Sequence, residues 1–115
     1  MCSSDLGGND TYYIGSGDTV VEGASAGTDT VDSSVTYTLA ANVENLVLNT
    51  SAGNINGTGN GDANTITGNS GDNVIDGGLG NDSMIGGAGN DTFYVNATGD
   101  VVSDSAGTEI GRAHV

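Results

Sequence analysis

An acidic or amide side chain recurs at every ninth residue in the second half of the chain. When residues 59–103 are written as consecutive nine-residue units, the sixth position is occupied by Asn64, Asn73, Asp82, Asp91 and Asp100. Glycine occupies the first position of four units and the fourth position of three. Glycine turns expose backbone carbonyls and Asp adds a charged oxygen. Oxygen donors of this kind are the ligands of Ca²⁺, a hard cation that takes about six to eight of them. The pattern therefore predicts calcium sites in the glycine-rich loops.

The sequence contains few side chains that could bind zinc or catalyse a reaction. Residues 7–109 contain 14 acidic residues and no Lys, Arg, His or Cys. Zn²⁺ prefers Cys and His ligands, and a nucleophilic hydroxyl needs a neighbouring base, so neither a zinc site nor nucleophilic catalysis is expected there. Paired carboxylates could hydrolyse a glycosidic bond, but acids at nine-residue spacing fit ion ligands better. The simpler alternative is that Asp, Asn and Gly are present only because they form turns.

The loops that carry these residues alternate with short extended segments. The eighth position of each unit is apolar and is occupied by Ile66, Ile75, Met84, Phe93 and Val102. One inward side chain in nine residues is too few for a helix, whose apolar stripe recurs every three or four residues. The spacing instead predicts an all-β fold, a parallel β-roll or β-solenoid of nonapeptide coils. With two units to a full turn, loop 68–73 lies beside loop 86–91, and loop 59–64 beside loop 77–82.

Two adjacent units, 77–85 and 86–94, carry the complete pattern Gly-Gly-X-Gly-Asn-Asp. They resemble the hemolysin-type calcium-binding repeat, known as the RTX repeat, and weaker units extend the resemblance to 59–103. The resemblance implies several calcium ions, each held between two loops on one edge by Asp and by loop carbonyls. It pairs Asp91 with loop 68–73, and Asp82 with loop 59–64 and with Asp100.

The resemblance implies ligands of two kinds. The side-chain ligands are the sixth-position residues Asp82, Asp91, Asp100, Asn64 and Asn73, and the loop residues are Gly68, Ser70, Gly71, Gly77, Gly78, Leu79, Gly80, Gly86, Gly87, Ala88 and Gly89. Asn64 and Asn73 depart from the family pattern, in which Asp is expected. An amide supplies an oxygen without a charge, so weaker sites are expected at these two positions.

The chain before residue 59 is less regular. Gly8-Asn9-Asp10 recurs in the second half of the chain as Gly89-Asn90-Asp91, and we interpret 7–22 as the remnant of an upstream array. Residues 23–58 resemble the β-rich spacer that often separates such arrays in large secreted bacterial proteins. Within it, the alternation of Val35, Tyr37 and Leu39 with polar residues predicts a half-buried strand, 40–45 a turn, and 46–48 a second strand. Residues 104–109 would begin the next spacer.

The two ends follow neither pattern. Residues 1–6 can be read from the DNA string GTG TGC TCT TCC GAT CT, and residues 110–115 from ATC GGA AGA GCA CAC GTC. Both strings resemble a common sequencing adapter, so we expect these segments to be non-native. The single Cys, the single Arg and the single His all lie in them. The alternative is that both segments are genuine.

Composition narrows the class of protein further. The chain has 115 residues, a net charge of −14, 35% hydrophobic residues and 4% aromatic residues. So few basic groups exclude phosphate recognition and hence nucleic-acid binding, and no apolar run approaches the length that membrane insertion needs. A thick apolar core is not expected. A cation that binds only the folded chain must then supply much of the stability.

These features favour a calcium-binding module that folds in response to calcium and is not itself an enzyme. The resemblance implies an extracellular, secreted bacterial parent protein exported by type I secretion machinery, since such repeats commonly accompany secreted proteases, lipases, epimerases and toxins. The alternative is an extracellular adhesin or an ice- or glycan-binding solenoid. Thr65, Thr67 and Thr92 could form an exposed ladder for such a ligand, although Val74 and Ser83 interrupt that row.

Overall fold

The computed structural model describes residues 8–18, 20, 27–95, 99–103 and 109–113, the last segment for its backbone only. These residues form short strands joined by turns, and none of them lies in a helix. No helix long and apolar enough to cross a membrane is therefore found in the described part of the chain. The strands are β1 (Thr11–Ile14), β2 (Thr30–Ser33), β3 (Tyr37–Thr38), β4 (Asn45–Leu48), β5 (Gly57–Thr58), β6 (Thr65–Thr67), β7 (Val74–Asp76), β8 (Ser83–Ile85), β9 (Asp91–Val95), β10 (Val101–Ser103) and β11 (Glu109–Ala113).

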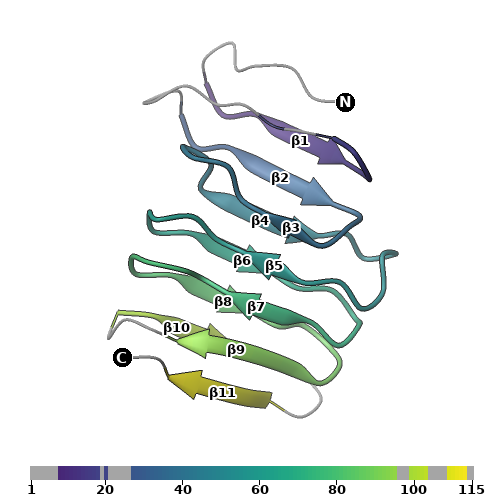
Figure 1. The fold of residues 1–115 in the computed structure, drawn as a ribbon, viewed down its shortest axis with the longest axis vertical. Coiled ribbons are helices and arrows are strands. Elements are labelled where there is room, and N and C mark those ends of the chain that lie inside the picture. Colours follow the sequence, from purple (N-terminus) through teal and green to yellow (C-terminus); the bar gives the residue numbers. More distant parts are fainter. Residues whose placement is uncertain (1–7, 19, 21–26, 96–98, 104–108, 114–115) are drawn as a thin grey trace.

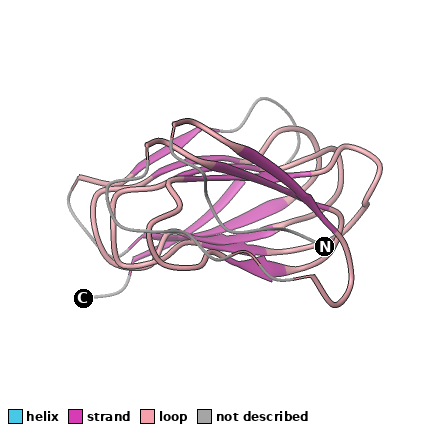
Figure 2. Cartoon of the chain, turned by 90° about the horizontal axis from the view of Figure 1, so that it is seen from above, coloured by secondary structure: helices cyan, strands magenta, loops and turns pink. Residues whose placement is uncertain are grey.

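The strands make two sheets that run along a stack of coils. Sheet A has the order β1-β2-β4-β6-β8-β10, and sheet B has the order β11-β9-β7-β5-β3. Every described pairing is parallel. From β2 onward the chain alternates between the sheets and lays each coil against the one before it (Figure 1). Viewed along the stack, the sheets form two layers joined by turns at both edges (Figure 2). The predicted parallel β-solenoid is confirmed.

Strand register confirms that two nonapeptides complete one turn. Thr65 of β6 pairs with Ser83 of β8, and Val74 of β7 pairs with Thr92 of β9, so partners in this part of the chain are separated by two repeat units. Identical positions of successive coils therefore form ladders. The earlier coils are less uniform, since the step from Thr30 to its partner Asn45 is shorter than two units, and the step from Asn45 to its partner Thr65 is longer.

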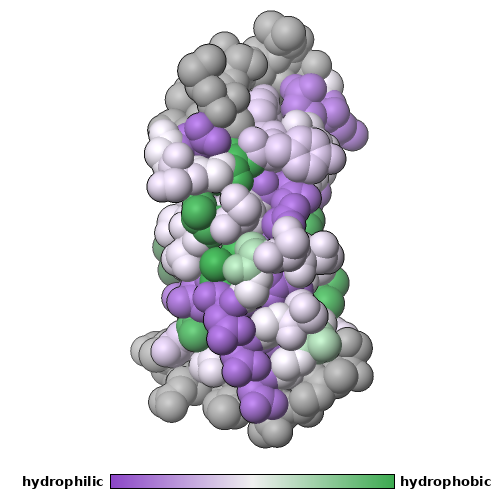
Figure 3. All heavy atoms as spheres, turned by 90° about the vertical axis from the view of Figure 1, so that its right-hand side faces the viewer, coloured by the Kyte–Doolittle hydropathy of each residue, from purple (hydrophilic) through white to green (hydrophobic). Residues whose placement is uncertain are grey.

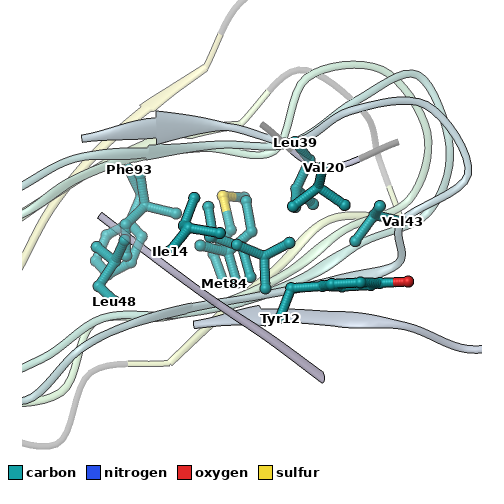
Figure 4. Close-up of a cluster of buried hydrophobic side chains, with 12 residues drawn as sticks. Tyr12, Ile14, Val20, Leu39, Val43, Leu48, Met84 and Phe93 are labelled. Atoms are coloured by element: carbon teal, nitrogen blue, oxygen red, sulfur yellow. The ribbon is translucent and has the colours of Figure 1, made fainter. Parts of the chain in front are cut away.

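The interior is a thin column of apolar side chains between the sheets. Ile66, Ile75, Met84 and Phe93 are completely buried, as their eighth position predicts, whereas Val102 is half-buried. The inward row of sheet A runs in register through Tyr12, Val31, Leu46, Ile66, Met84 and Val102. Figure 4 shows buried members of this column, among them Tyr12, Met84 and Phe93, filling the narrow space between the two layers together with Val20, Leu39, Val43 and Leu48. In β6 to β9 one fully buried apolar residue for each strand suffices because the layers lie so close together, whereas β1 and β4 each bury two.

The residues interpreted as a spacer continue the same solenoid. β4 pairs with β6, and β3 pairs with β5, which in turn pairs with β7. Both sheets therefore cross the expected boundary at residues 58 and 59 without a break. Leu39 is buried and Val35 and Tyr37 are half-buried, while the alternating polar residues between them are exposed. The predicted alternation is confirmed, although the strand β3 itself covers only Tyr37–Thr38.

The division into 7–22, 23–58, 59–103 and 104–109 stays a prediction, as does the foreign origin of the two ends. Residues 1–6 lie outside the described residues, and so does most of 104–109. Residues 109–113 form β11, which pairs through its backbone with β9. An unpaired strand edge accepts any extended backbone, so this pairing carries no information about where the segment came from.

Candidate metal centre

The acidic turns gather along two opposite edges of the stack. The A edge consists of the turns that precede the strands of sheet A, including 59–64 and 77–82 with Asp100 below them. The B edge consists of the turns that precede the strands of sheet B, including 68–73 and 86–91. These edges lie on the left and right of Figure 1. The predicted pairing of loop 59–64 with loop 77–82, and of loop 68–73 with loop 86–91, is confirmed by hydrogen bonds that join each pair.

A ladder of carboxylates runs down the A edge. The Oδ1 atom of Asp82 accepts the backbone N–H of Asn64 at 2.8 Å, and Oδ1 of Asp100 accepts the N–H of Asp82 at 2.8 Å. Asp82 is only 2% exposed, and its second oxygen, Oδ2, is buried without a hydrogen bond. A buried carboxylate oxygen without a partner is costly. Asp82 therefore has one oxygen that fixes the turn above and one that is available to a cation.

Backbone carbonyls of the preceding turn face the same space on the A edge. A β-carbon placed on Gly78 would lie 2.8 Å from the carbonyl oxygen of Asn60 and 3.5 Å from that of Gly59. A β-carbon on Gly77 would collide with Oδ2 of Asp82, and one on Gly59 would collide with the carbonyl oxygen of Gly77. The glycines thus let carboxylate and carbonyl oxygens lie where a side chain would otherwise be.

The repeat glycines serve two different purposes. Gly78, at the second position, has a φ of +78°, and Gly80, at the fourth position, has a φ of +89°. L residues rarely adopt this conformation. Gly77 and Gly86, at the first position, are not among the residues with positive φ. Backbone conformation therefore does not explain the glycines at the first position. They are needed because the sixth-position carboxylates, Asp82 and Asp91, lie against their α-carbons.

The B edge repeats this arrangement one half-turn later. The Oδ1 atom of Asp91 accepts the N–H of Asn73 at 2.8 Å. A β-carbon on Gly87 would lie 2.6 Å from the carbonyl oxygen of Asn69, and one on Gly86 would collide with Oδ2 of Asp91. Asp91 is completely buried. Figure 3 faces this edge and shows a hydrophilic row crossing its lower half, in keeping with the exposed outer residues of these turns, Asp72 and Asn90 among them.

The sixth-position asparagines have a different environment from the aspartates. Oδ1 of Asn64 accepts the N–H of Asn60 at 2.8 Å, and its Nδ2 donates to the carbonyl oxygens of Val43 and Glu44, both at 3.2 Å. Oδ1 of Asn73 likewise accepts the N–H of Asn69 at 3.0 Å, and its Nδ2 donates to the carbonyl of the coil above. Both ends of each amide are engaged within the protein. A role of Asn64 and Asn73 as calcium ligands stays a prediction.

Two further asparagines, which the sequence analysis did not single out, join the same coils. Nδ2 of Asn60 donates to the carbonyl oxygens of Ala40 and Val43, both at 2.8 Å. Nδ2 of Asn69 donates to the carbonyl oxygens of Asn49 and Gly53 at 2.9 and 2.8 Å. Amide N–H groups therefore hold carbonyl oxygens together where the coils before 59 meet the array. The available signal was the recurrence of Asn at the second position of two successive units.

The electrostatics of Asp82 reflect its burial and its acidic neighbours. Burial raises the pKa of Asp82 to about 6, the N–H of Asn64 offsets part of this effect, and the negative charges of Asp100 and Asp76 add to it. A carboxylate of this kind is unfavourable in its charged form until a cation compensates it. The carboxylates of Asp82 and its acidic neighbours therefore favour binding of a cation.

The predicted site residues divide between the two edges. The A edge holds Asn64, Gly77, Gly78, Leu79, Gly80, Asp82 and Asp100. The B edge holds Gly68, Ser70, Gly71, Asn73, Gly86, Gly87, Ala88, Gly89 and Asp91. Leu79 is 70% exposed, and Ser70 and Ala88 are also exposed. The side chains of Leu79 and Ala88 carry no donor, so these two residues can offer a metal only their backbone oxygens.

The donor set fits Ca²⁺. It combines the carboxylate of Asp82 or Asp91 with carbonyl oxygens of two turns, and Ca²⁺ accepts both kinds of oxygen at flexible geometry. No three acidic, His or Cys side chains of the described residues converge on one point. A site of this type does not need such a cluster, because most of its ligands are carbonyls. A bound calcium ion would supply the positive charge that the buried carboxylates lack.

Comparison with protein families agrees with this geometry. Residues 58–93 match the model of the RTX calcium-binding nonapeptide repeat, in four copies. We refer to residues 58–93 as the RTX segment. The RTX segment contains the turns of both edges and the carboxylates of Asp82 and Asp91, whereas Asp100 lies beyond it. The resemblance of 23–58 to a spacer between RTX arrays stays a prediction. Neither curated proteins nor solved structures gave a match to the chain.

Proposed function

We propose that this chain is a calcium-responsive folding module of a secreted protein and performs no reaction of its own. RTX repeats bind calcium, which supports calcium as the ligand. The observation that carries the proposal is the buried Oδ2 atom of Asp82, which has no hydrogen bond. It lies against the α-carbon of Gly77, where turns 59–64 and 77–82 bring carbonyl oxygens into close contact with glycines.

Calcium would act on folding through charge. The carboxylates of Asp82 and Asp100 stack along the A edge, Asp91 is buried on the B edge, and the whole chain carries a net charge of −14. The interior offers little compensation, because its apolar side chains form only a thin column between the two sheets. A cation that binds the coiled chain but not the unfolded chain stabilises the coil by mass action. Several ions, placed between successive turns of each edge, would link each coil to the next.

Secretion would explain why this module folds only when calcium is present. RTX repeats typically belong to secreted proteins. We propose that the parent protein passes through type I secretion machinery while calcium is scarce, and that this module coils outside the cell, where calcium is abundant. Its extracellular location is part of the same proposal. Any enzymatic or toxic activity would then belong to another part of the parent protein.

Circular dichroism tests the proposal directly. We expect the recombinant chain to be mostly disordered in EDTA and to gain β structure at millimolar Ca²⁺. The same concentration of Mg²⁺ should have little effect, because Mg²⁺ keeps its waters and demands a strict octahedron. A far-UV spectrum that is the same with Ca²⁺ and with EDTA would refute calcium-dependent folding.

A recognition module for ice or a glycan is less well supported. Such a ligand would need a regular outward row, but the outer face of sheet A changes from Thr11 and Thr30 to Asn45, Thr65, Ser83 and Val101 down the stack. Tyr13 is 72% exposed on the outer face of β1. A single exposed aromatic ring does not make an extended binding surface.

A further inference from the structure

The turn geometry of the RTX array recurs outside the matched residues, near the start of the stack. Residues 8–10 precede β1, and residues 27–29 precede β2, so both belong to the A edge. Oδ1 of Asp29 accepts the N–H of Asp10 at 2.8 Å. The same bond joins Asp82 to Asn64 and Asp91 to Asn73, also at 2.8 Å. Asp29 thus occupies the place of a sixth-position repeat carboxylate.

The residues on either side of this bond also match the array. The N–H of Thr28 donates to Oδ1 of Asn9 at 2.8 Å, just as the N–H of Asn90 donates to Oδ1 of Asp72 at 2.8 Å. Gly27 has a φ of +120° and Gly89 a φ of +94°.

Gly27 and Gly89 also have corresponding neighbours. A β-carbon on Gly27 would collide with the carbonyl oxygen of Gly8, and one on Gly89 would collide with that of Gly71. The paired segments 8–10 and 27–29 therefore have the backbone shape and the oxygen-lined surface of two stacked RTX turns.

Asp29 supplies an independent sign of a ligand. It is completely buried, and its Oδ2 atom has no hydrogen bond, as is also the case for Asp82. Oε2 of Glu44 accepts the N–H of Asp29 at 2.9 Å and brings a second negative charge to the same place. Residues 7–109 contain no Lys, Arg or His that could compensate these charges. A buried carboxylate in this situation needs a cation from solvent.

We propose that residues 8–10 and 27–29 hold a further Ca²⁺ site, with Asp29 as its central carboxylate. Its other ligands are carbonyl oxygens of the two turns, such as that of Gly8. This site rests on the proposed calcium binding by the RTX segment, but it lies outside residues 58–93. It places calcium between residues 8–10, in the segment interpreted as the remnant of an upstream array, and residues 27–29, in the segment interpreted as a spacer. Calcium would then order the early coils as well as the array.

The amount of bound calcium provides the test. Equilibrium dialysis with radioactive calcium should show one ion fewer for the Asp29→Asn variant of the full chain than for the unmodified chain. Asparagine keeps the oxygen that accepts the N–H of Asp10 but loses the charge. Asp32→Asn is the matched control, because it removes the same charge from the neighbouring strand β2, where Oδ1 only accepts a hydrogen bond from Asn49. It should leave the number of bound ions unchanged.

A second measurement uses the unmodified chain and does not depend on the variant folding. Gd³⁺, added in small amounts to the calcium-loaded protein, should broaden the amide NMR signals of Asp10 and Thr28 as well as those of turns 59–64 and 77–82. Broadening confined to the array, or an unchanged number of ions in Asp29→Asn, would overturn this site and leave the proposed function standing. Absence of calcium binding by the unmodified chain would overturn both.

Discussion

The carboxylate of Asp82 accepts the backbone N–H of Asn64, which lies one full coil earlier in the chain, at 2.8 Å. This one bond links the two features on which the site depends. It aligns the sixth positions of successive coils, and it leaves Oδ2 of Asp82 buried without a hydrogen bond, beside Gly77. The same residue thus joins two coils and presents an oxygen to a cation.

Replacing the charge of Asp82 should weaken calcium binding. Asp82→Asn retains an oxygen that can accept the N–H of Asn64 but removes the negative charge. We expect the calcium dissociation constant of the A edge to rise roughly ten- to a hundred-fold, in line with about 1.5–3 kcal/mol for a charge-assisted interaction. Isothermal titration calorimetry measures this change. Asp62→Asn, in the exposed part of the neighbouring turn, is the control, and an equal loss of affinity there would contradict a specific role for Asp82.

A side chain at Gly78 should strain the turn. Gly78→Ala puts a β-carbon 2.8 Å from the carbonyl oxygen of Asn60 at a backbone φ of +78°. We expect the calcium-loaded protein to lose about 1–3 kcal/mol of unfolding free energy. Urea denaturation at saturating Ca²⁺ provides the measurement. Gly61→Ala should be well tolerated, because no other atom lies within 4 Å of its new β-carbon.

Acid should weaken calcium binding and favour the calcium-free coil. Because burial raises the pKa of Asp82 from its ordinary 3.8 to about 6, the calcium-free fold prefers the protonated carboxyl. The protonated carboxyl of Asp82 adds at most about 3 kcal/mol to the unfolding free energy of the calcium-free fold. This stabilisation is fully present below about pH 4 and is lost as the pH rises through about 6. Protons compete with Ca²⁺ for the same carboxylate, so the calcium affinity should rise as the pH rises through about 6.

Calorimetry at two pH values tests this competition. Between pH 7.5 and pH 5 we expect the affinity of the A edge to fall about ten-fold, since about a tenth of Asp82 would remain charged at pH 5. Asp82→Asn should make the affinity of that edge much less sensitive to pH in this range. A pH response of the same size in the variant would assign the effect to other carboxylates.

The amide of Asn60 should matter for stability more than for calcium. Asn60→Ala removes two hydrogen bonds of 2.8 Å to the carbonyl oxygens of Ala40 and Val43 and one of 2.9 Å from the N–H of Asp62, but keeps the backbone oxygen of residue 60. We expect a loss of about 1–3 kcal/mol in unfolding free energy at saturating Ca²⁺, with little change in affinity. Thr50→Ala, at an exposed turn position outside the predicted site, should have almost no effect. A loss of calcium affinity without a loss of stability would contradict this structural role of Asn60.

The nonapeptide period was sufficient to predict the coil. Met84 and Phe93 are inward because the eighth position falls at the middle of each strand, and the step of two repeat units between paired strands follows from two strands in every turn. The pairing of Asp82 and Asp91 with the turns above them follows from the same step. Repetition makes such predictions strong, since each unit repeats the evidence of the one before it.

Other features could not be predicted because the sequence signal was ambiguous. Asn and Asp both favour turns, so nothing in the pattern distinguishes the amides of Asn64 and Asn60, which join coils, from metal ligands. The coils before residue 59 have unequal steps between paired strands, and without a fixed period their register depends on tertiary packing. The reason for glycine at position 77 also became evident only from the proximity of Asp82.

The equal spacing of the strands has a consequence for how such a chain can grow. Each coil contacts only its neighbours, so duplication of two repeat units would insert a complete rung whose upper and lower surfaces already match. Duplication of a single unit would move all later strands to the opposite sheet. Yet Ile75 and Phe93 point inward on one layer just as Ile66 and Met84 do on the other. Duplication of one repeat unit, like duplication of two, would therefore keep the apolar residues inside. This architecture is for that reason unusually tolerant of repeat duplication.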